Sequence, residues 1–191
     1  MSLNKVNLFS TPIWQTKILD DNYNNILKKT ILEKVKKNLS VKKTNFGGWQ
    51  SESILKEQTF YYLMDIIKET IKNTELNPKN IHFKQGWCNV NYKYNWNVIH
   101  NHGQHHLSAV YFVQKPKDSG NLALRDPRAI LTAGWGSWTD NFYKINNEDA
   151  IMYLNSIDKD LIIFPSFLDH FVTPSNSEKE RITVAFDILC N

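Results

Sequence analysis

The sequence predicts a mainly β fold, an antiparallel sandwich or jelly roll with supporting helices in front of it. After Pro78 the chain is divided into short runs rich in β-branched and aromatic residues. Turn signals made of proline, glycine, serine and aspartate separate these runs. No helical segments alternate with them, which argues against a parallel sheet. Strands are expected at 81–96, 107–114, 122–124, 161–164, 170–173 and 181–189.

Two helices are predicted before this β region. Loose alternation over 6–18, interrupted by Pro12, first indicates an edge strand. One helix should begin at Asp21, capped by Asp20 or Asp21 itself, and a second is expected over 56–74. Apolar residues at helical spacing predict the buried faces. These residues are Leu27, Ile31, Val35 and Leu39, then Phe60, Leu63, Met64, Ile67 and Ile71.

Length and composition predict one domain with a substantial core. The chain has 191 residues, and 41% of them are hydrophobic. We expect 1–79 to form the N-terminal strand and supporting helices, and 80–191 to form the jelly-roll core. The stretch 129–158 fits neither the helical nor the strand period. Because it is long and carries Trp135 and Trp138, we interpret it as a lid-like insertion.

Charge and cysteine content exclude several classes of protein. The net charge of +4 is spread out, and its lysine groups fall on or just after a predicted helix, so we do not expect a nucleic-acid partner. The two cysteines, Cys88 and Cys190, have no zinc or redox spacing and suit a reducing compartment. No apolar run approaches the ~20 residues of a membrane span, and the N-terminus lacks the apolar core of a signal peptide. We expect a cytoplasmic protein. The sequence does not determine the oligomeric state, and a homodimer is one possibility.

Histidines gather in one short stretch, HNHGQHH, which holds four of the six in the chain. On an extended segment His100 and His102 would point to the same face, so both rings could reach one ion. The adjacent His105 and His106 would point to opposite faces, so at most one of them could join. His170 follows an apolar strand and a Pro-Ser turn, and it is the candidate third ligand. The alternative is an inert histidine-rich loop, with His170 as a hydrogen-bonded core residue.

A possible anion site follows in the last predicted strand. Alternation puts Arg181 and Thr183 on one face of that strand. A guanidinium binds a carboxylate in a bidentate fork, and a hydroxyl can add a hydrogen bond. If this face lies beside the metal, the pair would hold an acidic small molecule over it. The alternative is an arginine at a sheet edge, paired with a surface carboxylate.

The order of these motifs resembles the 2-oxoglutarate- and Fe(II)-dependent oxygenases, most closely the small members of phages and marine bacteria. The resemblance covers about residues 80–190. It rests on Trp87 and Asn89, the His-x-His pair, the strand LSAVYFVQ, the DPR of 126–128, the run FPSFLDH and the final RIT.

The resemblance implies a double-stranded β-helix and an enzyme that uses Fe(II), 2-oxoglutarate and O2. It implies that His100, His102 and His170 hold the iron, and that Arg181 with Thr183 grips the distal carboxylate of 2-oxoglutarate. Oxidative decarboxylation to succinate and CO2 would be coupled to hydroxylation of a C–H bond. A phage-encoded member would act in the host cytoplasm.

Other residues receive roles from the resemblance together with strand alternation. Asn89 and Tyr111 are expected to line the keto-acid pocket, whereas Arg128, Trp135 and Trp138 are candidates for contact with the primary substrate. The substrate itself cannot be read; prolyl or amino-acid hydroxylation is what the resemblance suggests.

One departure from the wider superfamily stands out. Iron in that superfamily is usually held by two histidines and one carboxylate, and this chain has His102 where the carboxylate belongs. Asp126 or Asp169 could supply a carboxylate instead, although Asp169 would point away from the face of His170. Two other functions therefore stay open: a jelly-roll protein that binds a metal or ligand without turnover, and a cupin-like three-histidine metalloenzyme that uses no 2-oxoglutarate.

Overall fold

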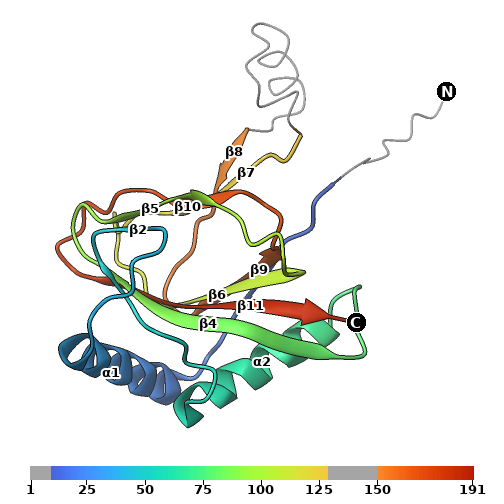
Figure 1. Ribbon diagram of the computed structural model, residues 1–191, viewed down its shortest axis with the longest axis horizontal. Coiled ribbons are helices and arrows are strands. Elements are labelled where there is room, and N and C mark those ends of the chain that lie inside the picture. Colours follow the sequence, from blue (N-terminus) through green and yellow to red (C-terminus); the bar gives the residue numbers. More distant parts are fainter. Residues whose placement is uncertain (1–9, 129–149) are drawn as a thin grey trace, which may run out of the picture.

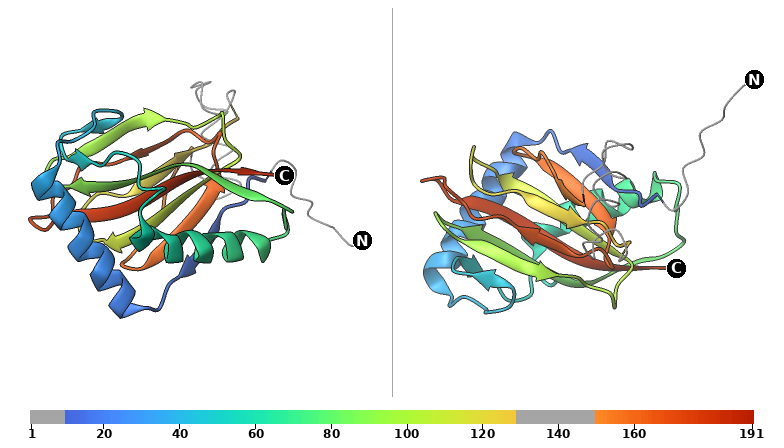
Figure 2. Two further views of the ribbon diagram at one scale, coloured as in Figure 1. Left: turned by 60° about the horizontal axis from the view of Figure 1, so that its bottom comes forward. Right: turned by 90° about the horizontal axis from the view of Figure 1, so that it is seen from above.

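Two antiparallel sheets face each other, and two helices cover the outer face of the larger sheet (Figure 1). The computed structural model describes residues 10–128 and 150–191. Two further views show the same layers from other directions (Figure 2). Every strand pairing in the described ranges is antiparallel. The prediction of a mainly β, antiparallel fold with supporting helices is confirmed.

The larger sheet has six strands and the smaller sheet has five. The order in the larger sheet is β1 (Trp14–Lys17), β9 (Asp160–Pro165), β6 (Leu107–Gln114), β11 (Arg181–Cys190), β4 (Ile81–Asn91) and β3 (Trp49–Gln50). The order in the smaller sheet is β2 (Asn45–Phe46), β5 (Trp96–His100), β10 (His170–Val172), β7 (Leu122–Arg125) and β8 (Ile151–Tyr153). The last strand, β11, therefore lies inside the larger sheet, between β6 and β4.

The helices lie close to where the sequence predicts them. They are α1 (Asp21–Lys37), the 3-10 helix η1 (Gln58–Phe60) and α2 (Tyr61–Lys72). Asp20 caps α1, because its carboxylate accepts a hydrogen bond from the backbone N–H of Tyr23 at 2.9 Å. The predicted buried face of the first helix is wrong at Leu39, which lies past the end of α1 and is 93% exposed. None of the described helices is long and apolar enough to cross a membrane.

Two predicted segments divide differently in the structure. The run 81–96 is not one strand: β4 ends at Asn91, a turn with positive φ at Tyr94 follows, and β5 begins at Trp96. Gly47 and Gly48 lie between β2 and β3, and a Cβ at Gly48 would lie only 2.9 Å from the carbonyl oxygen of Val90. Because φ is also positive there, only glycine fits. Of the insertion 129–158, strand β8 is described, whereas 129–149 lie outside the described residues.

The two faces of the larger sheet have different partners. One face packs on α1 and α2 and forms the main core; we call it the helix face. The other face looks toward the smaller sheet across a cavity, and we call it the cavity face. On β11 the residues Ile182, Val184 and Ile188 belong to the helix face, whereas Arg181 and Thr183 line the cavity. Strand alternation thus places apolar and polar side chains on opposite sides of one strand.

Candidate metal centre

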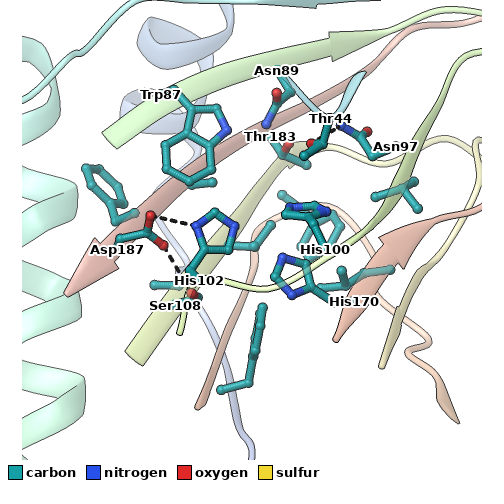
Figure 3. Close-up of a pocket in the computed structure, with 18 of the residues that line it drawn as sticks. Thr44, Trp87, Asn89, Asn97, His100, His102, Ser108, His170, Thr183 and Asp187 are labelled. Carbon is teal, nitrogen blue, oxygen red and sulfur yellow. Dashed lines mark hydrogen bonds and ion pairs between the residues drawn. The ribbon is translucent and has the colours of Figure 1, made fainter. Parts of the chain in front are cut away.

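Two histidines from neighbouring strands and a third from the loop after β5 meet in the cavity (Figure 3). His100 ends β5, and it is paired across the sheet with His170, the first residue of β10. His102 lies just beyond β5, where its backbone N–H donates to the carbonyl oxygen of Ser166 at 2.8 Å. One ring nitrogen of each histidine lies within 4.8 Å of those of the other two. The structure therefore brings together the three residues that the sequence predicts as ligands.

Hydrogen bonds fix which nitrogen of each ring is available. Nδ1 of His100 lies 2.7 Å from the carbonyl oxygen of Val98, and Nδ1 of His170 lies 2.9 Å from that of Leu168. A carbonyl oxygen only accepts hydrogen bonds, so each Nδ1 carries the proton and each Nε2 keeps a lone pair. This anchoring through the second nitrogen is the usual arrangement of metal-binding histidines.

Burial keeps two of the rings neutral. It lowers the pKa of His100, and it lowers the pKa of His170 to about 3, with His100 nearby as a smaller cause. Because a metal binds the neutral imidazole, both rings are in the binding form near neutral pH.

A buried arginine lies in the same cavity as the histidines. Arg181 is 2% exposed, and its Nη2 donates to Oδ1 of Asn91 at 3.1 Å, whereas its Nε has no partner. It forms no ion pair with any residue that the structure describes, and burial lowers its pKa to about 10. A buried cation without an anion is costly, so the guanidinium fits an acidic ligand. Thr183 and Asn89 also line this cavity, and Oδ1 of Asn89 is buried without a partner.

Comparison with known proteins decides the family. Residues 85–187, more than half of the chain, match the family model described as "Putative 2OG-Fe(II) oxygenase". The chain belongs to the 2OG-Fe(II) oxygenases. The cofactors of this family are Fe(II) and 2-oxoglutarate, so the prediction of these cofactors is confirmed. A comparison with curated protein sequences gives no match.

Several solved structures have a fold similar to that of this chain. HygX from Streptomyces hygroscopicus, with nickel and 2-oxoglutarate bound, has 8% sequence identity and a TM-score of 0.68, over 95% of this chain and 83% of that chain. A Pseudomonas putida prolyl-4-hydroxylase has 13% identity and a TM-score of 0.65, over 95% and 94%. The viral collagen prolyl hydroxylase of Paramecium Bursaria Chlorella virus-1 has 13% identity and a TM-score of 0.63, over 92% and 94%. At these identities the likeness shows the fold, the predicted double-stranded β-helix.

The residues of the oxygenase fit both cofactors. Three imidazoles with ring nitrogens within 4.8 Å of one another are a donor set that suits Fe(II) among the transition metals. The buried guanidinium of Arg181 has a planar fork that matches the carboxylate of 2-oxoglutarate. The set still differs from two histidines and one carboxylate, because His102 replaces the anionic ligand.

The structure corrects the prediction for Tyr111. Its neighbours Val110 and Phe112 line the cavity, so alternation turns Tyr111 toward the helices. There its side chain is fully buried, and its hydroxyl donates to Oδ1 of Asn24 on α1 at 2.9 Å. Tyr111 therefore cannot contact a keto acid in the cavity.

The remaining candidates also lie outside the cavity or outside the described residues. The guanidinium of Arg128 is bound to the carboxylate of Asp126, with Nε 2.9 Å from Oδ1, and neither residue is among the described residues that line the cavity. Asp126 is therefore not in place to replace His102 as a ligand. Asp169, the other candidate carboxylate, is not among the described residues that line the cavity. Its side chain accepts a hydrogen bond from Nδ2 of Asn101 at 2.8 Å. The substrate candidates Trp135 and Trp138 fall within 129–149, outside the described residues.

Sequence reasoning missed two residues that support His102. The carboxylate of Asp187 accepts a hydrogen bond from Nδ1 of His102, with Oδ2 at 2.8 Å. The indole of Trp87 is stacked on the His102 ring, with centroids 5.6 Å apart and planes 15° from parallel. A signal for Asp187 existed, since alternation from Arg181 and Thr183 brings position 187 to the cavity face.

Proposed function

We propose that the protein is a hydroxylase-type dioxygenase in which His100, His102 and His170 hold Fe(II). Arg181 and Thr183 bind the distal carboxylate of 2-oxoglutarate. One observation carries this assignment of residues: a buried guanidinium with no acidic partner among the described residues opens into the same cavity as three imidazoles with free Nε2 atoms.

Each side of the cavity contributes a different function. When bound, the iron supplies the redox chemistry that couples decarboxylation of 2-oxoglutarate to hydroxylation of a C–H bond by O2. Arg181 and Thr183 orient the keto acid, and the unpartnered Asn89 amide oxygen accepts a hydrogen bond from water or a ligand group. The walls formed by Val110, Phe112 and other apolar residues keep water away from the reacting centre.

The substrate class is proposed from the similar structures. Two of those compared are prolyl hydroxylases, so prolyl peptides are the first substrates to test. The free cysteines Cys88 and Cys190 support the further proposal that the protein works in the cytoplasm, which for a phage-encoded protein is that of the host.

Turnover of 2-oxoglutarate without a primary substrate tests the proposal. Iron-loaded protein incubated with 2-oxoglutarate under air should form succinate, and calorimetry should detect 2-oxoglutarate binding at millimolar concentration. His170→Ala should abolish succinate formation, because one of three ligands is lost. His82→Ala is the matched control, since His82 is exposed on β4 and lies outside the cavity.

The same experiment separates the two other functions. Metal and 2-oxoglutarate binding without succinate would indicate a binding protein without turnover. Metal binding without any 2-oxoglutarate binding would indicate a three-histidine metalloenzyme that uses no keto acid. Either result would overturn the proposed function.

A further inference from the structure

A buried carboxylate lies directly behind the His102 ring. Asp187 is 0% exposed, and its Oδ2 lies 2.8 Å from Nδ1 of His102 (Figure 3). Its Oδ1 accepts a hydrogen bond from the hydroxyl of Ser108 at 3.1 Å. Asp187 comes from β11 and Ser108 from the neighbouring β6, so the carboxylate is held by the rigid centre of the larger sheet.

The partners of this carboxylate are histidines and a serine. Within the described residues, no lysine or arginine lies within ion-pair distance of Asp187. Besides His102 and Ser108 it meets His105, whose Nδ1 is 3.8 Å from Oδ2, too far for a hydrogen bond. A buried carboxylate is costly without a compensating positive charge. A metal ion on Nε2 of His102 would place that charge on the far side of the same ring.

The surroundings of His102 fix the direction of its ring. The backbone N–H of His102 donates to the carbonyl oxygen of Ser166, and the Oγ atoms of Ser166 and Ser108 lie 2.9 Å apart. Since the Ser108 hydroxyl donates to Asp187, it accepts from Ser166. Backbone and ring of His102 are thus tied to one buried network, and Trp87 covers one face of the ring.

We infer that Asp187 supplies, through His102, the negative charge that a directly bound carboxylate supplies in the two-histidine, one-carboxylate site. Asp187 is a positioning residue, because it acts on the metal only through the imidazole. It fixes the protonated nitrogen of His102 and makes the opposite nitrogen a stronger donor. The inference rests on the proposed function, since it takes the three histidines as the metal ligands, and it accounts for the histidine at the position of the carboxylate.

Metal affinity, measured apart from turnover, tests this inference. Asp187→Asn keeps the shape and removes the charge, and Asp187→Ala removes both. Both variants should bind Fe(II), and Co(II) as a spectroscopic substitute, about 10- to 100-fold more weakly than the wild type in anaerobic titrations. The visible absorption of the Co(II) protein should also change, because the donor strength of His102 changes.

Asp160→Asn is the matched control. Asp160 is also buried, at 5% exposure, and accepts hydrogen bonds from Nε2 of Gln15 at 3.0 Å and the backbone N–H of Ile157 at 2.9 Å. It does not line the cavity, so its loss should weaken the fold without changing metal affinity. Unfolding of the metal-free proteins shows whether each variant folds. Equal affinity of folded Asp187→Asn and wild type would overturn the inference.

A charge exchange gives a second, independent test. His102→Asp puts a carboxylate at the ligand position but leaves Asp187 buried beside it without its partner, and the two like charges repel. The double variant His102→Asp/Asp187→Asn restores a single negative charge. It should bind Fe(II) no more weakly than His102→Asp alone, because no imidazole remains for Asp187 to act through, and a loss of about 10- to 100-fold relative to the single variant would contradict the inference.

The outcomes separate the inference from the function on which it rests. Wild-type protein that binds metal without forming succinate would contradict the proposed function. The metal affinity of the Asp187 variants would still test the inference. Wild-type protein that forms succinate, with unchanged affinity in the Asp187 variants, would sink the inference alone. A wild type that binds no metal would overturn both.

Discussion

The two faces of β11 differ in what they are built to do. On the helix face Ile182, Val184 and Ile188 are fully buried against α1, α2 and the neighbouring strands. On the cavity face of the same strand, Arg181 and Asp187 are buried just as deeply but are charged. Burial of an apolar side chain stabilises the fold, whereas burial of a charge opposes it unless a partner compensates.

Stability and ligand binding should therefore depend on different faces of the same strand. Substitutions on the helix face should change the free energy of unfolding and leave ligand binding intact. Substitutions on the cavity face should change ligand binding, with little loss of stability or even a gain. Because neighbouring residues of one strand belong to opposite faces, pairs of variants one position apart test this separation directly.

A fall in pH is expected to have the largest effect on the free energy of unfolding, and it should act through a histidine in the cavity. The pKa of His170 is lowered by burial from 6.5 to about 3 in the folded protein. Between these pH values the unfolded chain takes up a proton that the folded chain does not. The contribution of neutral His170 to the free energy of unfolding is therefore complete above about pH 6.5 and is lost as the pH falls toward about 3. The full loss is on the order of 4–5 kcal/mol.

Urea unfolding of the metal-free protein at several pH values measures this loss. The free energy of unfolding should fall less steeply with acid in His170→Gln than in the wild type, because the buried titrating group is absent. If the free energy of unfolding of the two proteins falls equally with pH, groups other than His170 cause the acid sensitivity. That result would contradict the role given to His170 on the cavity side.

Arg181→Met should have the next largest effect, on 2-oxoglutarate binding. Loss of one partner of a buried charge pair costs about 2–5 kcal/mol in binding, a reduction of roughly 30- to 4,000-fold. The free energy of unfolding should stay the same or rise, because an uncompensated buried cation is replaced by an apolar side chain. Calorimetry and urea unfolding measure the two quantities. An Arg181→Met protein that binds 2-oxoglutarate normally would refute the assignment of the carboxylate site.

Ile182→Ala, one position away, should show the reverse. Ile182 is fully buried on the helix face, and truncation of such a residue costs about 2–5 kcal/mol of stability. The affinity for 2-oxoglutarate should remain within about 3-fold of wild type below the unfolding temperature, since coupling across well-packed but separate contacts is small. If Ile182→Ala weakens binding as much as Arg181→Met does, the two faces are not separable.

Much of this arrangement could be predicted from the sequence, because strand alternation is a local property. Alternation puts Arg181 and Thr183 on one face, and both line the cavity. The spacing of His100 and His102 also led to a shared site, although β5 ends at His100 and His102 lies in the loop beyond it. The hydrogen bond from His102 to Asp187 depends on that loop and on the register of distant strands, and neither could be predicted from a local pattern.

The predictions for Tyr111 and Leu39 are wrong for specific structural reasons. Strand β6 is buried on both sides, between the helices and the second sheet, so nearly all of its residues are apolar or aromatic. No polar alternation marks which side faces the cavity, so the sequence-based prediction places Tyr111 on the wrong side. The helical period of α1 continues as far as Leu39, but Asn38 is extended and ends the helix before it. In both cases tertiary context decided what the pattern left open.

Tyr111→Phe gives the smallest effect and tests that correction directly. The Tyr111 hydroxyl donates to Asn24 of α1, so its removal deletes one part-buried hydrogen bond and should cost about 1 kcal/mol of stability. Binding of 2-oxoglutarate should not change, because Tyr111 lies on the side of β6 away from Val110 and Phe112. Asn24→Ala removes this bond and also the bond from Asn24 Nδ2 to the carbonyl oxygen of Val113 at 3.1 Å, so it should destabilise the protein more than Tyr111→Phe does, and the two changes should add only in part. A Tyr111→Phe protein with intact stability but weaker 2-oxoglutarate binding would return this residue to the keto-acid pocket.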